Sequence, residues 1–284
     1  MRGWWQDLTD LVLPAECGGC GRPRATLCAA CRAALCGSAP RRVRPVPEPP
    51  GLPVVHAAAP YEDAVRAVLL AHKERGALGL AGPLGAALAE AVRAGLRGGR
   101  PETAQRGDTG ARSWVDGTHG GSQGRTVPLS LVPVPSSRAS VRARGQDPAR
   151  RIALAAAGEL RRAGIPARVL AVLRQRRAVA DQSGLDSRQR QANLAGALEV
   201  TAGGGRLLAG AGRIVVVDDL MTTGASMAEA VRAIHDVDMQ EKTRSEAVRG
   251  RGTDAVRRRL LGRENAISAA VVAAPPDSFE INRN

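Results

Sequence analysis

Apolar residues recur with two different spacings along the chain, which predicts a mixture of strands and helices. Runs of β-branched and aliphatic residues that predict buried strands occupy Leu129–Val134, Ala167–Leu173, Ile214–Val217 and Ala269–Ala273. Apolar residues three and four apart predict helices over residues 4–12, 65–72, 84–92, 152–160 and 226–234. Because the strands alternate with helices, the chain predicts an α/β domain in which helices flank a parallel sheet.

Three segments lack any apolar period and divide the chain. Residues 38–60 hold a dense run of prolines, which favour extended backbone and disfavour a sheet interior, so we expect a linker there. Residues 98–126 have the polar, glycine-rich composition of a disordered insertion, and the densely charged residues 236–266 predict a second, exposed insertion. The expected organisation is a cysteine module at 1–37, the linker, a helical segment at 61–97, a main domain at 127–276 and a tail at 277–284.

Export and membrane segments are not expected. The longest uncharged run, Gly76–Ala89, is shorter than the roughly 20 residues that a membrane span needs. Asp7 and Asp10 interrupt the N-terminal apolar residues. The apolar region of a signal peptide would carry no acidic residues. The sequence therefore favours a cytoplasmic protein without membrane insertion, in which cysteines need an explanation other than disulfides.

Four cysteines form two Cys-x-x-Cys pairs close to the N-terminus. They are Cys17, Cys20, Cys28 and Cys31, with glycines between and beside them that permit tight turns. Four thiolates fit a closed tetrahedral zinc site, in which no position is open for catalysis. Disulfides or a thioredoxin-like pair are the alternatives, but neither accounts for two pairs at this spacing in a reducing compartment. We therefore expect one structural zinc ion.

The net positive charge of the chain indicates an anionic partner. The formal net charge is +14, and thirteen arginines against five acidic residues lie between Val132 and Val200. Lysine occurs only at positions 73 and 242, so arginine supplies the other 39 of the 41 basic residues, a bias that high-GC coding would also produce. Aromatic residues make up 2% of the chain, which argues against a stacking platform for single-stranded nucleic acid.

The most specific motif begins in a predicted buried strand and runs from Arg213 to Ser226. The strand delivers two carboxylates, Asp218 and Asp219, and a Thr-Thr-Gly turn leads directly into a helix. Hydroxyl groups, loop N–H groups and the helix N-terminus would converge on one phosphate dianion. The residues that would supply these donors are Thr222, Thr223, Gly224, Ala225 and Ser226. The acidic pair suits neighbouring hydroxyls or a divalent cation. The alternative is a structural turn in which Ser226 and Glu229 form a capping box.

This motif resembles the phosphoribosyl-diphosphate (PRPP) signature of type I phosphoribosyltransferases. The resemblance implies that the acidic pair faces the ribose hydroxyls, that the loop binds the 5-phosphate, and that Mg²⁺ accompanies PRPP. A second motif, Leu131–Arg138, ends a strand with Ser136, Ser137 and Arg138. In the same family such a loop faces the pyrophosphate, where hydroxyls and a guanidinium would stabilise the departing charge. The alternative here is a simple strand stop.

A third segment, Leu173–Leu194, resembles the mobile loop of the ComF family, a group of competence-associated proteins related to phosphoribosyltransferases. The matching positions are Arg174, Gln182, Leu185, Arg190 and Asn193. The alternative is a solvated, charged loop. The ComF resemblance spans nearly the whole chain, including the cysteine module. The chain departs from the family at residues 146–148 and at Lys73-Glu74, where the family carries Lys-Tyr.

Two functions follow as expectations from these resemblances. The first is an enzyme that transfers phosphoribose from PRPP to an unknown acceptor and releases pyrophosphate, with Asp218, Asp219, Arg138 and Arg190 as its catalytic residues. The second is a non-catalytic ComF-type competence protein that assists DNA uptake through contacts with single-stranded DNA or DNA-uptake proteins. The intact acidic pair and Thr-Thr-Gly turn favour retention of PRPP binding under both hypotheses.

Overall fold

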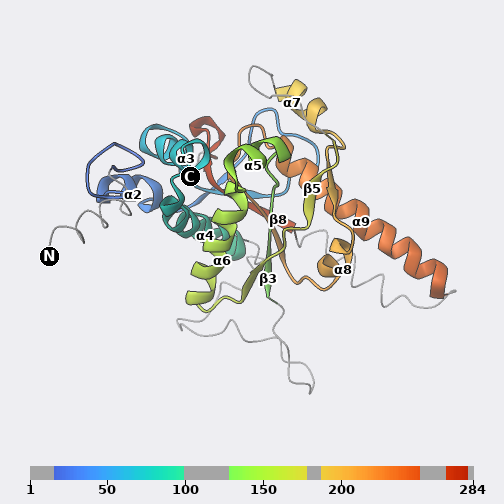
Figure 1. The fold of residues 1–284 in the computed structure, drawn as a ribbon. Helices are drawn as coiled ribbons and strands as arrows, with labels where there is room; N and C mark the ends of the chain where they lie inside the picture. Colours follow the sequence, from blue (N-terminus) through green and yellow to red (C-terminus); the bar gives the residue numbers. More distant parts are fainter. Residues whose placement is uncertain (1–15, 99–127, 178–186, 250–266, 281–284) are drawn as a thin grey trace.

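A twisted six-stranded sheet forms the centre of the computed structural model, which describes residues 16–98, 128–177, 187–249 and 267–280 (Figure 1). The strand order is β1-β2-β8-β7-β3-β4. These strands are β1 (Arg41–Val43), β2 (Val55–Pro60), β3 (Leu129–Pro133), β4 (Ala167–Val169), β7 (Ile214–Leu220) and β8 (Ile267–Ala274). β1 pairs antiparallel with β2, and every other pairing in the sheet is parallel. The predicted α/β class with a mostly parallel sheet is therefore confirmed.

Helices cover both faces of this sheet (Figure 1). They are α2 (Ala29–Cys36), α3 (Asp63–Glu74), α4 (Ala81–Gly98), α5 (Arg138–Arg144), α6 (Pro148–Arg162), α7 (Ser187–Leu194), α8 (Gly204–Ala209) and α9 (Ala225–Arg249). Two 3₁₀ turns, η1 (Leu78–Leu80) and η3 (Pro276–Ser278), and a small antiparallel pair, β5 (Leu173–Gln175) with β6 (Leu198–Val200), complete the described elements.

The two faces of β7 belong to two different hydrophobic clusters. Val215 and Val217 pack with residues of α3, α4 and α6, whereas Ile214 and Val216 pack with residues of α8 and α9. Successive side chains of a strand point to opposite faces, so both faces of the sheet are buried. This explains why the central strands have continuous apolar runs and no alternation of polar residues.

The expectation that residues 38–60 form a linker is wrong, because the segment contributes β1 and β2. β2 lies inside the sheet between β1 and β8, with Val55 opposite Ala269 and Ala59 opposite Ala273. The prolines at positions 45–53 occupy the connection between β1 and β2, where they interrupt no ladder. The proline content correctly indicated the connection between β1 and β2, but it led to the wrong prediction for the strand that follows.

Two other predicted boundaries also differ. α9 continues to Arg249, through a stretch that was expected to belong to an exposed insertion. Glutamate, lysine, arginine and glutamine are favourable helix formers, and no glycine or proline interrupts the helix before Gly250. The predicted strand 167–173 divides into β4 and β5, which belong to different sheets. The expectations for residues 4–12, 99–126 and 250–266 lie outside the described residues.

Candidate functional site

The strand order places a topological switch point between β3 and β7. These two strands are adjacent and parallel, with Pro133 opposite Val217 near their carboxyl ends. After β3 the chain continues to β4 on one side, and after β7 it continues to β8 on the other side. Connections that diverge in this way leave a crevice outside the carboxyl ends of the strands, where ligands of open α/β sheets bind.

One side of this crevice is the turn between β7 and α9, which carries the predicted phosphate-binding residues. Asp219 is buried and Asp218 is half-buried at the end of β7. Thr222 is exposed, Thr223 and Ser226 are half-buried, and Ala225 begins α9. Gly224 has a φ of +74°, and its carbonyl accepts a hydrogen bond from the Ala228 N–H. The structure therefore brings the predicted residues together at the N-terminus of a 25-residue helix.

The capping-box interpretation of Ser226 and Glu229 is wrong. α9 begins directly after Gly224, so Ser226 lies inside the first turn instead of preceding it. Glu229 Oε1 accepts a hydrogen bond from the Leu198 N–H at 3.0 Å, and the Glu229 carboxylate pairs with Arg232 at 2.7 Å. Burial raises the pKa of Glu229, but these partners outweigh burial and lower the pKa overall. Glu229 thus fixes β6 against α9.

The acidic pair carries more negative charge than its surroundings favour. Burial and the neighbouring Asp219 carboxylate raise the pKa of Asp218 well above its usual range. Lys73 Nζ lies 3.0 Å from Asp219 Oδ2 and partly opposes this effect. Burial alone would lower the pKa of Lys73, but the charges of Asp219 and Asp218 outweigh it and raise the pKa. Two carboxyl groups therefore share one ammonium group.

Lys73 was not among the predicted site residues. It lies near the end of α3, 146 residues before Asp219 in the sequence. The sequence offers one signal, because Lys73 is one of two lysines in an arginine-rich chain. This signal does not indicate that the end of α3 lies at the carboxyl edge of the sheet, because that depends on how the helix packs.

The other side of the crevice is the loop after β3, which carries Ser136 and Ser137. Ser137 caps α5 by accepting a hydrogen bond from the Ser140 N–H at 3.0 Å. Ser136 Oγ donates to Asp147 Oδ1 at 3.2 Å, and Asp147 in turn caps α6. Both predicted hydroxyls thus reach the expected edge of the sheet while also serving the local structure. Arg138 is the first residue of α5, and its side chain lies outside what the structure describes.

α7 lies against the start of α9 and carries Arg190. Leu194, one turn after Arg190, packs with Ala225 at the N-terminus of α9. Residues four apart lie on one face of a helix, so Arg190 and Leu194 share a face. Arg190 is half-buried, and its Nε has no hydrogen-bond partner among the described residues. A buried guanidinium N–H without a partner beside a helix N-terminus is suited to an anion.

The other predicted positions of the segment Leu173–Leu194 have different structural roles. Arg174 pairs with Glu199 at 2.8 Å across β5 and β6, which makes it part of the small sheet. Arg177 donates from Nη2 to the carbonyls of Asn193 and Ala195 and so caps the end of α7. Gln182 and Leu185 lie outside the described residues.

The four predicted cysteines form one compact cluster. All four Sγ atoms lie within 4.8 Å of one another, and those of Cys20 and Cys28 are 3.6 Å apart. Tetrahedral coordination with zinc–sulfur bonds of about 2.3 Å places the sulfur atoms about 3.8 Å apart, so the cluster fits such an ion. Burial raises the pKa of Cys17, but hydrogen bonds from neighbouring backbone N–H groups outweigh it and lower the pKa to about 6. The cluster could therefore hold a metal ion such as zinc.

The cysteine module is continuous with the main hydrophobic core. Cys17, Cys28 and Cys31 belong to the same cluster of buried residues as α3 and α4. At Gly19, an added Cβ would lie 2.6 Å from Cys31 Sγ and 3.2 Å from Val68 of α3, so only glycine fits there. The cysteine cluster consequently supports the helix that carries Lys73.

No family model matches the chain, and no curated protein matches it either. Among the described residues, no helix combines the length and apolar character needed to cross a bilayer. The function must therefore be inferred from the residues of the site.

Proposed function

We propose that the protein binds PRPP in the crevice between β3 and β7 and transfers its phosphoribosyl group to an acceptor. The observation that carries this proposal is the position of the acidic pair and the Thr-Thr-Gly turn at the switch point, directly before the N-terminus of α9. The resemblance of the same residues to the PRPP signature of type I phosphoribosyltransferases supports it. The proposal includes the ComF family as the relative of this chain.

Each part of the crevice has a role under this proposal. Asp218 and Asp219 accept hydrogen bonds from the ribose hydroxyls, and the turn at 222–226 donates to the 5-phosphate. The loop at 136–138 and Arg190 face the pyrophosphate. The bond between the anomeric carbon and the pyrophosphate oxygen breaks, and the electron pair leaves with pyrophosphate. The acceptor forms the new bond and loses a proton.

Magnesium fits the oxygen-rich side of this crevice. Mg²⁺ prefers oxygen ligands, and the acidic pair offers carboxylate oxygens whose charge Lys73 only partly balances. Asp218 and Asp219 are the protein carboxylates that would hold it beside the oxygens of the ligand. When bound, Mg²⁺ would neutralise charge on the departing pyrophosphate.

The direct test is calorimetric titration with PRPP and Mg²⁺, followed by an assay of pyrophosphate release with a panel of bases and amines. Binding together with release for at least one acceptor supports the enzyme. Binding without release for any acceptor supports the non-catalytic alternative. Absence of PRPP binding would refute both roles of the crevice.

We also infer that Cys17, Cys20, Cys28 and Cys31 hold one structural zinc ion. The purified protein is expected to contain about one equivalent of zinc, because four converging thiolates leave no open position. Cys17→Ser should lower the melting temperature, since zinc binding contributes directly to folding free energy and the cluster shares its core with α3 and α4.

Cys36→Ser is the matched control for this prediction. Cys36 is exposed at the end of α2 and lies outside the four-cysteine cluster, so its replacement should change neither zinc content nor melting. A zinc content well below one equivalent, together with unchanged melting of Cys17→Ser, would exclude a structural zinc site.

The second candidate function, a ComF-type competence protein that binds single-stranded DNA, is favoured by the exposed arginines near the crevice. Arg142 of α5 and Arg150 and Arg151 of α6 are exposed. Contacts between arginine and phosphate release counterions, so affinity should fall steeply as salt concentration rises. Fluorescence anisotropy with a labelled oligonucleotide is expected to show about a tenfold or greater loss of affinity between 50 and 200 mM salt.

The double variant Arg150→Gln and Arg151→Gln tests which residues make these contacts, and it should reduce both the affinity for the oligonucleotide and the salt dependence of that affinity. No binding at low salt, or an affinity that salt does not change, would remove nucleic acid as a direct partner. In that case the remaining partner class for this candidate is a DNA-uptake protein.

A further inference from the structure

Lys73 connects two parts of the crevice that come from distant parts of the sequence. Its Nζ lies 3.0 Å from Oδ2 and 3.5 Å from Oδ1 of Asp219, so the ammonium group reaches both carboxylate oxygens. The Asp219 side chain is 9% exposed and that of Lys73 is 37% exposed. Because the carboxylate is largely shielded from water, this contact is stronger than an exposed ion pair and restricts the orientation of the carboxylate.

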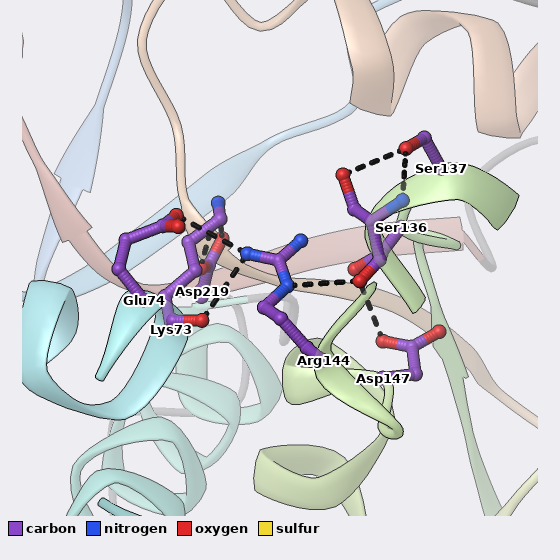
Figure 2. Close-up of polar contacts among 8 residues, drawn as sticks. Lys73, Glu74, Ser136, Ser137, Arg144, Asp147 and Asp219 are labelled. Atoms are coloured by element: carbon purple, nitrogen blue, oxygen red, sulfur yellow. Dashed lines mark hydrogen bonds and ion pairs between the residues drawn. The ribbon is translucent and has the colours of Figure 1, made fainter. Parts of the chain in front are cut away.

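Arg144 fixes the backbone from which Lys73 extends. Its Nη1 donates to the Lys73 carbonyl and to Glu74 Oε1, each at 3.1 Å, and its Nε donates to the Ser140 carbonyl at 3.2 Å. Figure 2 shows Arg144 between the end of α3 and the loop that carries Ser136 and Ser137. Carbonyl groups at a helix C-terminus lack partners within the helix, so a guanidinium placed there stabilises the end of α3.

A series of hydrogen bonds links residues from the two sides of the crevice. The Asp219 carboxylate accepts from the Lys73 ammonium, Arg144 donates to the Lys73 and Ser140 carbonyls, and the Ser140 N–H donates to the Ser137 hydroxyl. The series connects the carboxylate near the end of β7 with the loop that follows β3 (Figure 2). Residues from both sides of the crevice are thereby linked without any ligand.

We propose that Lys73 is a positioning residue, whose ammonium group holds the Asp219 carboxylate in the orientation that accepts a ribose hydroxyl. Arg144 acts one step further away by holding Lys73. This inference rests on the proposed binding of a phosphorylated ribose in the crevice. Among 41 basic residues only two are lysines, and a compact ammonium leaves more of the carboxylate open to a ligand than a forked guanidinium would.

The test compares ribose 5-phosphate with 2-deoxyribose 5-phosphate, which lacks one ribose hydroxyl. Calorimetry on the full chain gives the ratio of the two affinities, and this ratio cancels any general loss of fold or of phosphate attraction. The parent protein should prefer ribose 5-phosphate by about tenfold or more, the value of a hydrogen bond to a charged group. Lys73→Met should reduce this preference to about twofold or less, while its affinity for inorganic phosphate stays within about twofold of the parent.

Arg66→Met is the matched control, because it removes one positive charge from the exposed face of the same helix. It should retain the full preference for ribose 5-phosphate. Arg144→Gln should cause a smaller loss of the preference than Lys73→Met, because the ammonium group is retained but its backbone is less firmly held. Lys73→Arg should restore part of the preference.

Three results would overturn the inference. If Lys73→Met weakens both sugar phosphates equally, Lys73 serves the fold or attracts the phosphate. If the variant loses more affinity for inorganic pyrophosphate than for ribose 5-phosphate, Lys73 contacts the pyrophosphate instead. If the parent protein binds neither sugar phosphate nor PRPP, the proposed function fails and this inference fails with it. Binding of sugar phosphates and PRPP by the parent protein therefore distinguishes failure of the proposed function from failure of the inference about Lys73 alone.

Discussion

Gly224→Val should abolish PRPP binding and lower the melting temperature, and both effects have the same physical origin. Gly224 has a φ of +74°, which β-branched residues avoid. An added Cβ would lie 3.1 Å from two methyl carbons of Leu52 and 3.4 Å from Pro45, so the Leu52 side chain would have to shift by a few tenths of an ångström. The strain is on the order of 1–3 kcal/mol, and it falls on the turn that is proposed to bind the 5-phosphate.

Gly164→Val is the matched control for this prediction. Gly164 has a φ of +78°, lies just after α6, and has open space where its Cβ would be. The control should lose stability through backbone strain and keep its affinity for PRPP, which calorimetry and thermal melting can measure side by side. PRPP binding by Gly224→Val at the level of Gly164→Val would show that the turn is purely structural.

The proposed role of Gly224 illustrates what sequence alone could predict. The residues from Asp218 to Ser226 are consecutive, so their strand, turn and helix follow from local pattern and propensity, and the structure places them together. A side chain added at position 224 would meet Leu52 and Pro45, more than 170 residues earlier in the chain, and no local pattern indicates this contact.

The features that sequence analysis missed depend on packing between distant segments. β2 has the sequence Val-His-Ala-Ala-Ala-Pro, which has little β-branched character, and it becomes a strand because β8 pairs with it in parallel. Lys73 is a site residue because α3 returns to the carboxyl edge of the sheet. The four cysteines were predictable because their spacing alone restricts the geometry of the cluster.

Asp218→Asn should stabilise the free protein at neutral pH while it weakens PRPP binding. Burial and the Asp219 carboxylate raise the pKa of Asp218 well above its usual range, so the folded protein holds this proton more tightly than the unfolded chain does. Above the unfolded pKa of about 3.9, the ionised carboxylate therefore opposes folding, and the opposition grows until the pH passes the folded pKa. Asparagine removes this charge at every pH.

The expected gain at pH 7 is about 0.5–2 kcal/mol, a common range for a stabilising substitution. It should shrink toward zero near pH 3, where Asp218 is protonated in both the folded and the unfolded protein. Thermal melting of the parent and the variant between pH 3 and 8 measures this, with Asp147→Ala as a contrasting variant because Asp147 caps α6 and loss of the cap should destabilise the protein. A variant that is less stable than the parent at pH 7 would show that the Asp218 carboxylate supports the fold. A variant that is more stable but binds PRPP weakly would show that the acidic pair is retained at the expense of stability, as expected for a ligand-binding site.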